Sequence, residues 1–184
     1  GWYDNLNESV AQITANHGEG ELLLDYSGGT GILTRRLYNA LGDVGLGVLI
    51  VDSSPKFLRL AQERSKEDER VGFRLIQYLR EERRLQTLQE VLDPSIWDRG
   101  IDALASTNAI HLYYQLNSTL GSWHNLLRPG GKSYIQSGNI VMDHPAEDAD
   151  AVATHVSDVI EARFGHRPQA LAFTPSEIAA IVEA

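Results

Sequence analysis

Short, almost wholly apolar runs alternate with segments of helical periodicity along most of the chain. Apolar runs of this kind are typical of strands buried on both faces of a parallel sheet, and they occur at 21–26, 47–52, 71–79, 101–107 and 132–138. Helices are expected between them and after them, over 30–42, from 54 onward, and over 80–92, 116–127 and 146–164. This order predicts a doubly wound, mostly parallel α/β sheet of the Rossmann type, with helices on both faces.

Helix boundaries can be assigned from capping residues. Ser54 and Pro55 open one helix as cap and first residue, and its Phe57, Leu60 and Ala61 are expected to face the sheet. Further boundary signals are Gly42 as a helix stop, Asp93-Pro94 as the end of the helix over 80–92, the turn 128–131, and a capping box formed by Thr174, Pro175 and Glu177.

A glycine-rich segment follows the first expected strand and opens the next helix. Residues 25–31 read DYSGGTG, and Gly28, Gly29 and Gly31 allow positive φ angles and close approach of a ligand to the backbone. Asp52 ends the next strand, where an acid can accept hydrogen bonds from both hydroxyls of a ribose. This arrangement predicts a nucleotide-like cofactor. The alternatives are a tight turn without a ligand and an acid that only stabilises the following helix.

Two cofactors fit such a loop, NAD and S-adenosylmethionine. A dinucleotide requires G-x-G-x-x-G/A so that its pyrophosphate can rest on the helix N-terminus, and here the last position is Thr34. S-adenosylmethionine has no pyrophosphate. Its amino-acid end needs backbone polar groups, and its ribose needs the same acid. The sequence therefore favours S-adenosylmethionine, with S-adenosylhomocysteine as the product.

Four segments resemble the motifs of class I S-adenosylmethionine-dependent methyltransferases. LLLDYSGGTG (22–31) resembles the first motif, GVLIVDSSPKFLRLAQER (47–64) the second, IDALASTNAIHLYYQL (101–116) the fourth-strand motif, and LLRPGGKSYIQSG (126–138) the turn into the fifth strand. Order and spacing agree over about 22–138. TPSEIAAIVEA (174–184) resembles the helix before the family's closing antiparallel strand pair. We therefore expect one domain over 1–184, truncated at both ends and lacking that pair, with a domain that simply finishes on this helix as the alternative.

The resemblance implies a place for each matching polar residue. Asp25 corresponds to the motif acid near the methionine end of the cofactor, and Asp52 corresponds to the acid that holds the ribose. Ser53 matches the residue beside adenine. Thr107 and Asn108 match positions that face the sulfonium and the substrate.

Two positions depart from the family pattern. Gly29 and Gly31 match the second and third motif glycines, but Ser27 stands where the family has the first. The acid that normally follows the third strand is absent, and Gln77 and Tyr78 are the candidates to replace it. The cofactor-binding residues expected from the loop and the resemblance are Asp25, Tyr26, Ser27, Gly28, Gly29, Gly31, Asp52, Ser53, Tyr78, Thr107 and Asn108.

Methyl transfer needs alignment more than a dedicated catalytic group, because a sulfonium is already a good leaving group. A base is required only when the acceptor arrives protonated. His111, which follows the fourth expected strand, is the candidate base, and a core histidine with a satisfied ring is the alternative. Further candidates, for the acceptor side or an N-terminal lid, are Tyr113, Tyr114, Asn139, Trp2 and Tyr3.

The composition restricts the partners. A net charge of -9 disfavours nucleic acid, and no apolar run approaches the ~20 residues of a membrane span. The chain has no cysteine, and its six histidines lack metal-ligand spacing, so no metal is expected. The sequence predicts a cytoplasmic enzyme that methylates an oxygen, nitrogen or carbon atom of a small molecule. A non-catalytic binding module of the same fold and, further away, a nicotinamide-dependent oxidoreductase are the alternatives.

Overall fold

The computed structural model describes residues 5–113, 115–136, 146–165, 176–177 and 180–181. The chain divides into two compact units. The first comprises residues 1–107 and 122–136, and the second comprises residues 108–121 and 137–184.

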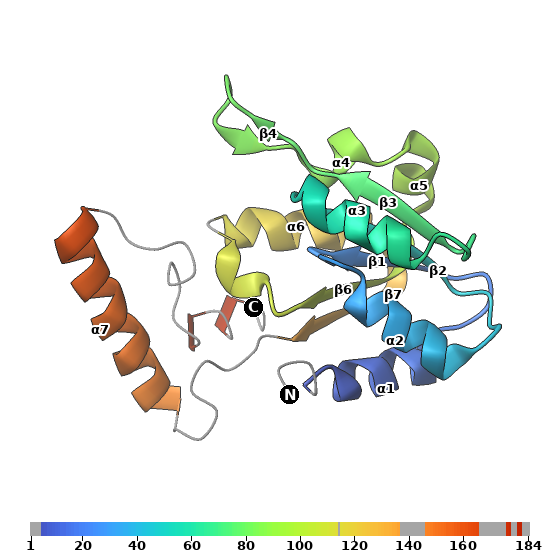
Figure 1. Ribbon diagram of the computed structural model, residues 1–184, viewed down its shortest axis with the longest axis horizontal. Helices are drawn as coiled ribbons and strands as arrows, with labels where there is room; N and C mark the ends of the chain where they lie inside the picture. The colour runs from blue at the N-terminus through green and yellow to red at the C-terminus, as the bar shows by residue number, and fades with distance from the viewer. Residues whose placement is uncertain (1–4, 114, 137–145, 166–175, 178–179, 182–184) are drawn as a thin grey trace. The chain divides into compact units, whose positions relative to one another are not determined.

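The first unit contains a parallel sheet of five strands (Figure 1). Their order is β3-β2-β1-β6-β7, and every neighbouring pair is parallel. The strands are β1 (Leu22–Tyr26), β2 (Gly47–Asp52), β3 (Val71–Leu75), β6 (Ile101–Thr107) and β7 (Leu127–Gln136). The strand order reverses between β1 and β6, and ligands of such sheets bind beyond the carboxyl ends of the strands at this point. The sheet confirms the expected doubly wound fold.

Helices cover both faces of this sheet, as expected. Asp25 and Tyr26 are consecutive in β1, so their side chains point to opposite faces. The Asp25 carboxyl meets Thr34 of α2 (Ile32–Leu41), whereas the Tyr26 ring packs on Trp123 near the end of α6 (Leu116–Leu126). The helix α1 (Leu6–Asn16), which the sequence analysis did not assign, lies against α2 and β7.

Helix α3 (Pro55–Arg64) begins as its cap predicts, but it buries a different stripe of residues. The Ser54 hydroxyl accepts a hydrogen bond from the N–H of Phe57, and Pro55 is the first helical residue. Leu58 and Ala61 are buried, whereas Phe57 is 46% exposed, so the prediction that Phe57 faces the sheet was wrong. The cap fixes the start of the helix, and Phe57 then lies one residue, about 100°, away from the buried stripe.

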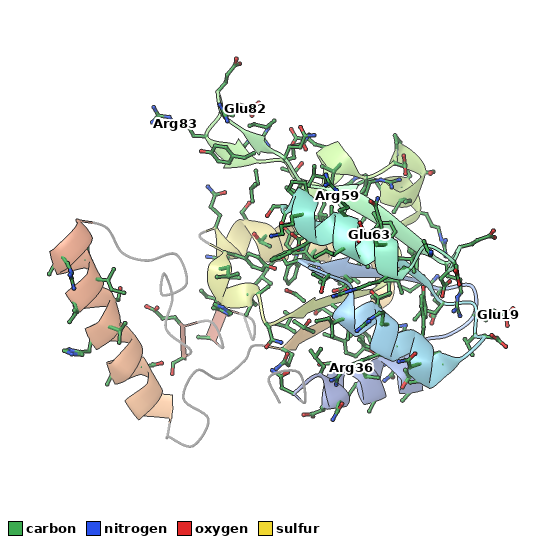
Figure 2. All side chains as sticks on the ribbon, viewed as in Figure 1. Glu19, Arg36, Arg59, Glu63, Glu82 and Arg83 are labelled. Atoms are coloured by element: carbon green, nitrogen blue, oxygen red, sulfur yellow. The ribbon has the colours of Figure 1, made fainter. Side chains whose placement is uncertain are left out.

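The region after β3 differs most from the prediction. The third strand ends at Leu75 instead of residue 79, and the helix expected over 80–92 was wrong. An antiparallel pair, β4 (Tyr78–Leu79) and β5 (Arg84–Leu85), stands there, followed by α4 (Leu88–Val91) and α5 (Pro94–Arg99). Figure 2 shows Glu82 and Arg83 at the tip of this hairpin.

Local signals explain this difference. The hydroxyl of Thr87 and the side chain of Glu90 form a capping box that starts α4 at residue 88. Pro94 occupies the first position of α5, so it opens a helix instead of ending one. Leu85, which has helical spacing with Leu88 and Leu92, instead lies in the hairpin opposite Tyr78 and is 46% exposed.

The strand β7 begins earlier than expected and contains the predicted turn as an irregularity. Residues 129–131 lie inside it, where the pairing with β6 shifts between Ile101↔Leu127 and Ala103↔Lys132. Gly130 has a φ of 83° there, a conformation suited to glycine.

The second unit contains the 3-10 helix η1 (Ile110–Leu112), the first turns of α6, and α7 (Ala146–Phe164), whose bounds match the prediction. Thr174 and Pro175 lie outside the described residues. None of the described helices combines the length and apolar character that crossing a membrane requires.

One buried acid ties three strands together at the amino-terminal edge of the sheet. Asp102 of β6 is 2% exposed, and its Oδ2 accepts a hydrogen bond of 2.8 Å from the N–H of Leu22 at the start of β1. Its Oδ1 forms an ion pair with Arg128 of β7. This edge therefore holds β1, β6 and β7 in place and leaves the opposite, carboxyl edge for ligands.

Asp102→Ala is expected to lower the free energy of unfolding by about 2–4 kcal/mol. It leaves the part-buried N–H of Leu22 without its acceptor and removes the buried partner of an ion pair with the half-exposed Arg128. Urea denaturation measures the change. Asp98→Ala, which removes an exposed acid from α5, is the control and should stay within about 0.5 kcal/mol of the wild type. Equal effects of the two substitutions would contradict the structural role of Asp102.

Candidate functional site

The loop between β1 and α2 takes the backbone path that its glycines allow. Ser27, Gly29 and Gly31 have φ angles of 58°, 57° and 73°, in the left-handed region. The N–H of Gly28 donates to the carbonyl oxygen of Val51 (3.2 Å). The N–H of Gly31 donates to the carbonyl oxygen of Gly28 (3.0 Å). Ser27 therefore adopts a left-handed conformation that glycine takes readily, at a cost of about 1–2 kcal/mol for an L-residue.

Gly28 is required by close packing instead of by its φ angle. A Cβ atom at this position would lie 2.7 Å from Cγ of Asp25, 2.8 Å from its Oδ2, and 2.9 Å from Cγ2 of Ile50. Real Cβ atoms do not approach neighbours so closely. The loop backbone thus lies directly against the carboxyl of Asp25.

Asp52 lies beside the loop at the end of β2. Its Oδ2 accepts a hydrogen bond from the N–H of Gly29 (2.9 Å), and its Oδ1 accepts one from the N–H of Ser54 (2.7 Å). The side chain is 8% exposed, and each carboxylate oxygen keeps a second acceptor site. The structure therefore holds the carboxylate in a fixed orientation at the carboxyl edge of the sheet, with capacity for additional donors.

Asp25 is fully buried behind the loop. Burial, as the largest cause, raises the pKa of its carboxyl from 3.8 to about 7. The hydroxyl of Thr34, which donates to Oδ2 at 3.1 Å, lowers this pKa, and the negative charge of Asp52 raises it. From the sequence alone, Thr34 counted only against NAD. Its position in the first turn of the helix after the loop was the signal in the sequence that it could lie near Asp25.

Tyr26 is a packing residue in this structure. Its ring makes an edge-to-face contact with Trp123, with 5.1 Å between the ring centroids. Burial, and then the charge of Asp52, raise the pKa of its phenol to about 12. Tyr26 thus lies next to the loop, and its side chain points to the face of the sheet opposite to that of Asp25.

The end of the third strand offers two exposed candidates and one buried residue. Tyr78 is 57% exposed on β4, and Gln77 is exposed next to it. Ile76, which the sequence analysis did not consider, is 4% exposed, and its N–H donates to the carbonyl of Asp52 (2.9 Å). Ile76 is therefore the residue of this segment that the structure ties to the end of β2.

The remaining candidates divide between the two units. Thr107 ends β6 in register with Gln136 of β7, and Ser53 is exposed between Asp52 and the cap of α3. Asn108, with a φ of 55°, and the half-buried His111 of η1 belong to the second unit. Burial lowers the pKa of the His111 imidazole below 6.5. Other candidates, Trp2, Tyr3, Tyr114 and Asn139, lie outside the described residues, whereas Tyr113 follows η1.

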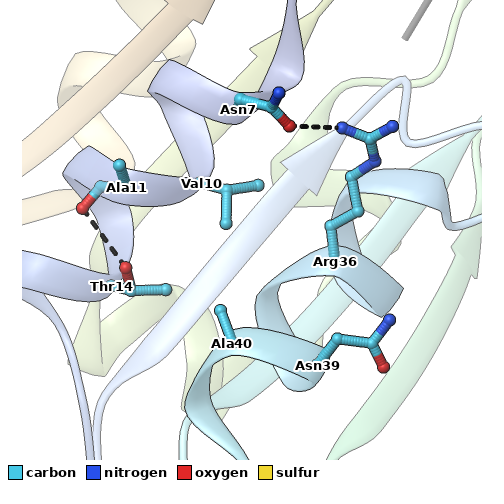
Figure 3. A pocket seen from close by; sticks show the side chains of 7 residues that line it. All are labelled: Asn7, Val10, Ala11, Thr14, Arg36, Asn39 and Ala40. Atoms are coloured by element: carbon cyan, nitrogen blue, oxygen red, sulfur yellow. Dashed lines mark hydrogen bonds between the residues drawn. The ribbon is translucent and has the colours of Figure 1, made fainter. Parts of the chain in front are cut away.

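A separate hollow of about 630 Å³ lies between α1 and α2 (Figure 3). Across it, Nη1 of Arg36 donates to Oδ1 of Asn7 (2.8 Å), and Val10 and Ala40 form part of its wall. None of its lining residues belongs to the glycine loop. The hollow is therefore distinct from the candidate site at the carboxyl edge.

Comparison with known proteins identifies related sequences. A sequence model described as "Methyltransferase domain" matches residues 24–133, more than half of the chain, and one of a protein family of unknown function matches 130–184. The hybrid PKS-NRPS synthetase lepA of Aspergillus flavus is 30% identical over 112 residues, which are 59% of this chain and 3% of that protein. The chain thus spans only about 3% of the length of the curated relatives it matches.

Two solved structures illustrate the likeness in fold. Phosphoethanolamine N-methyltransferase 2 of Haemonchus contortus, in complex with S-adenosyl-L-methionine, is 25% identical with a TM-score of 0.55, over 73% of this chain and 28% of that chain. The YcgJ protein of Bacillus subtilis is 16% identical with a TM-score of 0.62, over 98% of this chain and 67% of that chain. The second likeness concerns the fold alone.

Gly28→Ala is expected to lower the free energy of unfolding by about 2–3 kcal/mol, because its Cβ would overlap Asp25 and Ile50. Gly29→Ala should cost only about 1 kcal/mol, since its φ is positive but no atom lies within 4 Å of the added Cβ. Urea denaturation of both variants measures the difference. A larger loss for Gly29→Ala than for Gly28→Ala would contradict the packing of the loop on Asp25.

Proposed function

Because the chain belongs to the methyltransferase-domain family, we propose that it binds S-adenosylmethionine at the glycine loop and transfers its methyl group to a small-molecule acceptor. The observation that carries this proposal is the pairing of the loop with Asp52. The relative from Haemonchus contortus, whose structure contains S-adenosyl-L-methionine, supports the choice of cofactor.

Asp52 is suited to hold a ribose. Its two oxygens are aimed by the N–H groups of Gly29 and Ser54, and each has one acceptor site left for a hydroxyl of the ligand. Gly28, Gly29 and Gly31 have no side chains, so they leave the loop backbone open to close approach of a ligand. These features supply orientation, which is the main requirement of the reaction.

S-adenosylmethionine, when bound, supplies an electrophilic methyl group on a sulfonium with a neutral thioether as leaving group. The protein's part is to align the acceptor, to exclude water and, for a protonated acceptor, to take up a proton. His111 is our candidate for the group that accepts this proton, because the lowered pKa of its imidazole keeps the ring neutral at pH 7.

The acceptor is proposed to be a small molecule with an oxygen, nitrogen or carbon nucleophile. The net charge of -9 opposes a nucleic-acid acceptor, because phosphate binding needs a basic surface. The Haemonchus contortus relative makes phosphoethanolamine one acceptor to test, beside a phenol, a primary amine and a β-keto ester. Release of S-adenosylhomocysteine with at least one of them is the expected result.

Asp52→Asn should weaken binding of S-adenosylhomocysteine about 10- to 100-fold, because hydrogen bonds to a charged acceptor are worth roughly 1.5–3 kcal/mol. Calorimetric titration of the wild type and the variant measures the change. Asp43→Asn, which removes an exposed acid before β2, makes the same change in net charge and should leave the affinity unaltered. Saturable binding of NADH instead of S-adenosylhomocysteine would overturn the proposed cofactor.

His111→Gln should lower the methyl-transfer rate about 100-fold while cofactor affinity stays within about twofold, as expected for loss of a general base. In the wild type, at saturating S-adenosylmethionine, the rate should fall as the pH drops through the pKa of His111, below 6.5, and this limb should be absent in the variant. His124→Gln, at an exposed position of α6, is the control. An unchanged rate in His111→Gln would remove His111 from the mechanism.

A further inference from the structure

The carboxyl of Asp25 is completely buried but has few hydrogen bonds. Oδ2 accepts the hydroxyl of Thr34 at 3.1 Å, and Oδ1 has no hydrogen-bond partner among the residues that the structure describes. An ionised carboxylate offers about four acceptor sites, so most of them would face apolar surroundings. Ionisation under these conditions is costly, and the protonated acid is favoured while no cation is near.

The neighbours of Asp25 provide no compensating positive charge. Thr34 faces it from α2, the backbone of Gly28 from the loop, and Ile50 from β2. The charged group that acts on Asp25 is Asp52, and its negative charge opposes ionisation. None of the ion pairs between described residues includes Asp25. A cation that arrives at the glycine loop would be the first opposite charge in this environment.

We propose that Asp25 and Thr34 form a charge-responsive pair, in which Asp25, below neutral pH, keeps its proton until a cationic ligand binds at the glycine loop and then releases it to water. This inference rests on the proposed function, because S-adenosylmethionine carries a sulfonium and an ammonium group. The acid becomes a carboxylate, the proton enters the solvent, and no other bond changes. Thr34 is the positioning residue, since its hydroxyl donates to the carboxylate that forms.

The pair gives the site a means of distinguishing cofactor from product. S-adenosylhomocysteine retains the ammonium but lacks the sulfonium charge, so it provides less compensation for an ionised Asp25. The preference for the cofactor over the product should therefore increase from pH 6 to pH 8. Burial, which raises the pKa of Asp25 to about 7, places this change near neutral pH.

Titration calorimetry at pH 6, 7 and 8, in two buffers with different ionisation enthalpies, tests the pair. Binding of S-adenosylmethionine to the wild type should release most of a proton at pH 6 and little at pH 8, apart from titration of the ligand's own amino group. The sign follows from the raised pKa: affinity should fall up to about tenfold per pH unit below pH 7 and level off above it.

Variants of Asp25 and Thr34, with one control, distinguish proton release by the pair from titration of the ligand and from general structural effects. Asp25→Asn should abolish the proton release and leave only the ligand's amino-group titration, near pH 8 for an α-amino group. Thr34→Val, which fills a similar volume without the hydroxyl, should move the pH dependence to higher pH, and Thr34→Ser should restore it. Thr14→Val, on α1 in the hollow of Figure 3, is the matched control and should behave as the wild type.

The outcomes distinguish this inference from the function on which it rests. If S-adenosylmethionine binds with the same affinity and no proton release at all three pH values, the pair is overturned while the proposed function stands. If S-adenosylmethionine does not bind at any pH, the proposed function is overturned and the pair with it. If Asp25→Asn does not fold, the shift in Thr34→Val and its rescue in Thr34→Ser decide the question.

Discussion

The contact between the glycine loop and Asp25 is the constraint on which the carboxyl edge of the sheet depends. Gly28 leaves no room for a side chain against the carboxyl, so the loop must follow one path over the end of β1. On that path the N–H of Gly29 reaches Asp52, whose strand is in parallel register with β1, Tyr26 opposite Val51. One close contact thus fixes the position of two acids and of the start of α2.

The strands of the first unit could be predicted because burial on both faces leaves a simple apolar signature. The bounds of β2 and β6 match the expected runs. The region after β3 could not be assigned in this way, since Leu85, Leu88 and Leu92 have helical spacing but lie in three different local structures. The capping box at Thr87 overrides the spacing there. Helix α1 was detectable from Leu6, Val10 and Ile13, at positions i, i+4 and i+7, although the polar residues around them obscured it.

The site was predictable to the extent that backbone requirements can be detected in a sequence. The glycines at 29 and 31 have the left-handed angles that their motif implies, and Asp52 lies where a strand-end acid should lie. The place of Thr34 in the first turn after the loop was visible in the sequence, but its contact with Asp25 was not, because the hydroxyl reaches Asp25 only after Gly31, in the left-handed conformation, has set the start of α2. Ser27 shows the opposite case, where a residue that departs from the motif still takes the left-handed conformation that glycine favours.

The two strand-end acids have the same side chain but different surroundings, and this difference separates their chemistry. Asp52 accepts hydrogen bonds from two backbone N–H groups and is 8% exposed, which suits a fixed acceptor. Asp25 accepts one hydroxyl in a fully buried position, and burial raises its pKa to about 7. Environments that drive the pKa values of two titratable groups apart usually give the two groups different roles. A ribose needs an acceptor of constant charge, whereas a group whose own charge can change responds when its ligand loses positive charge during the reaction.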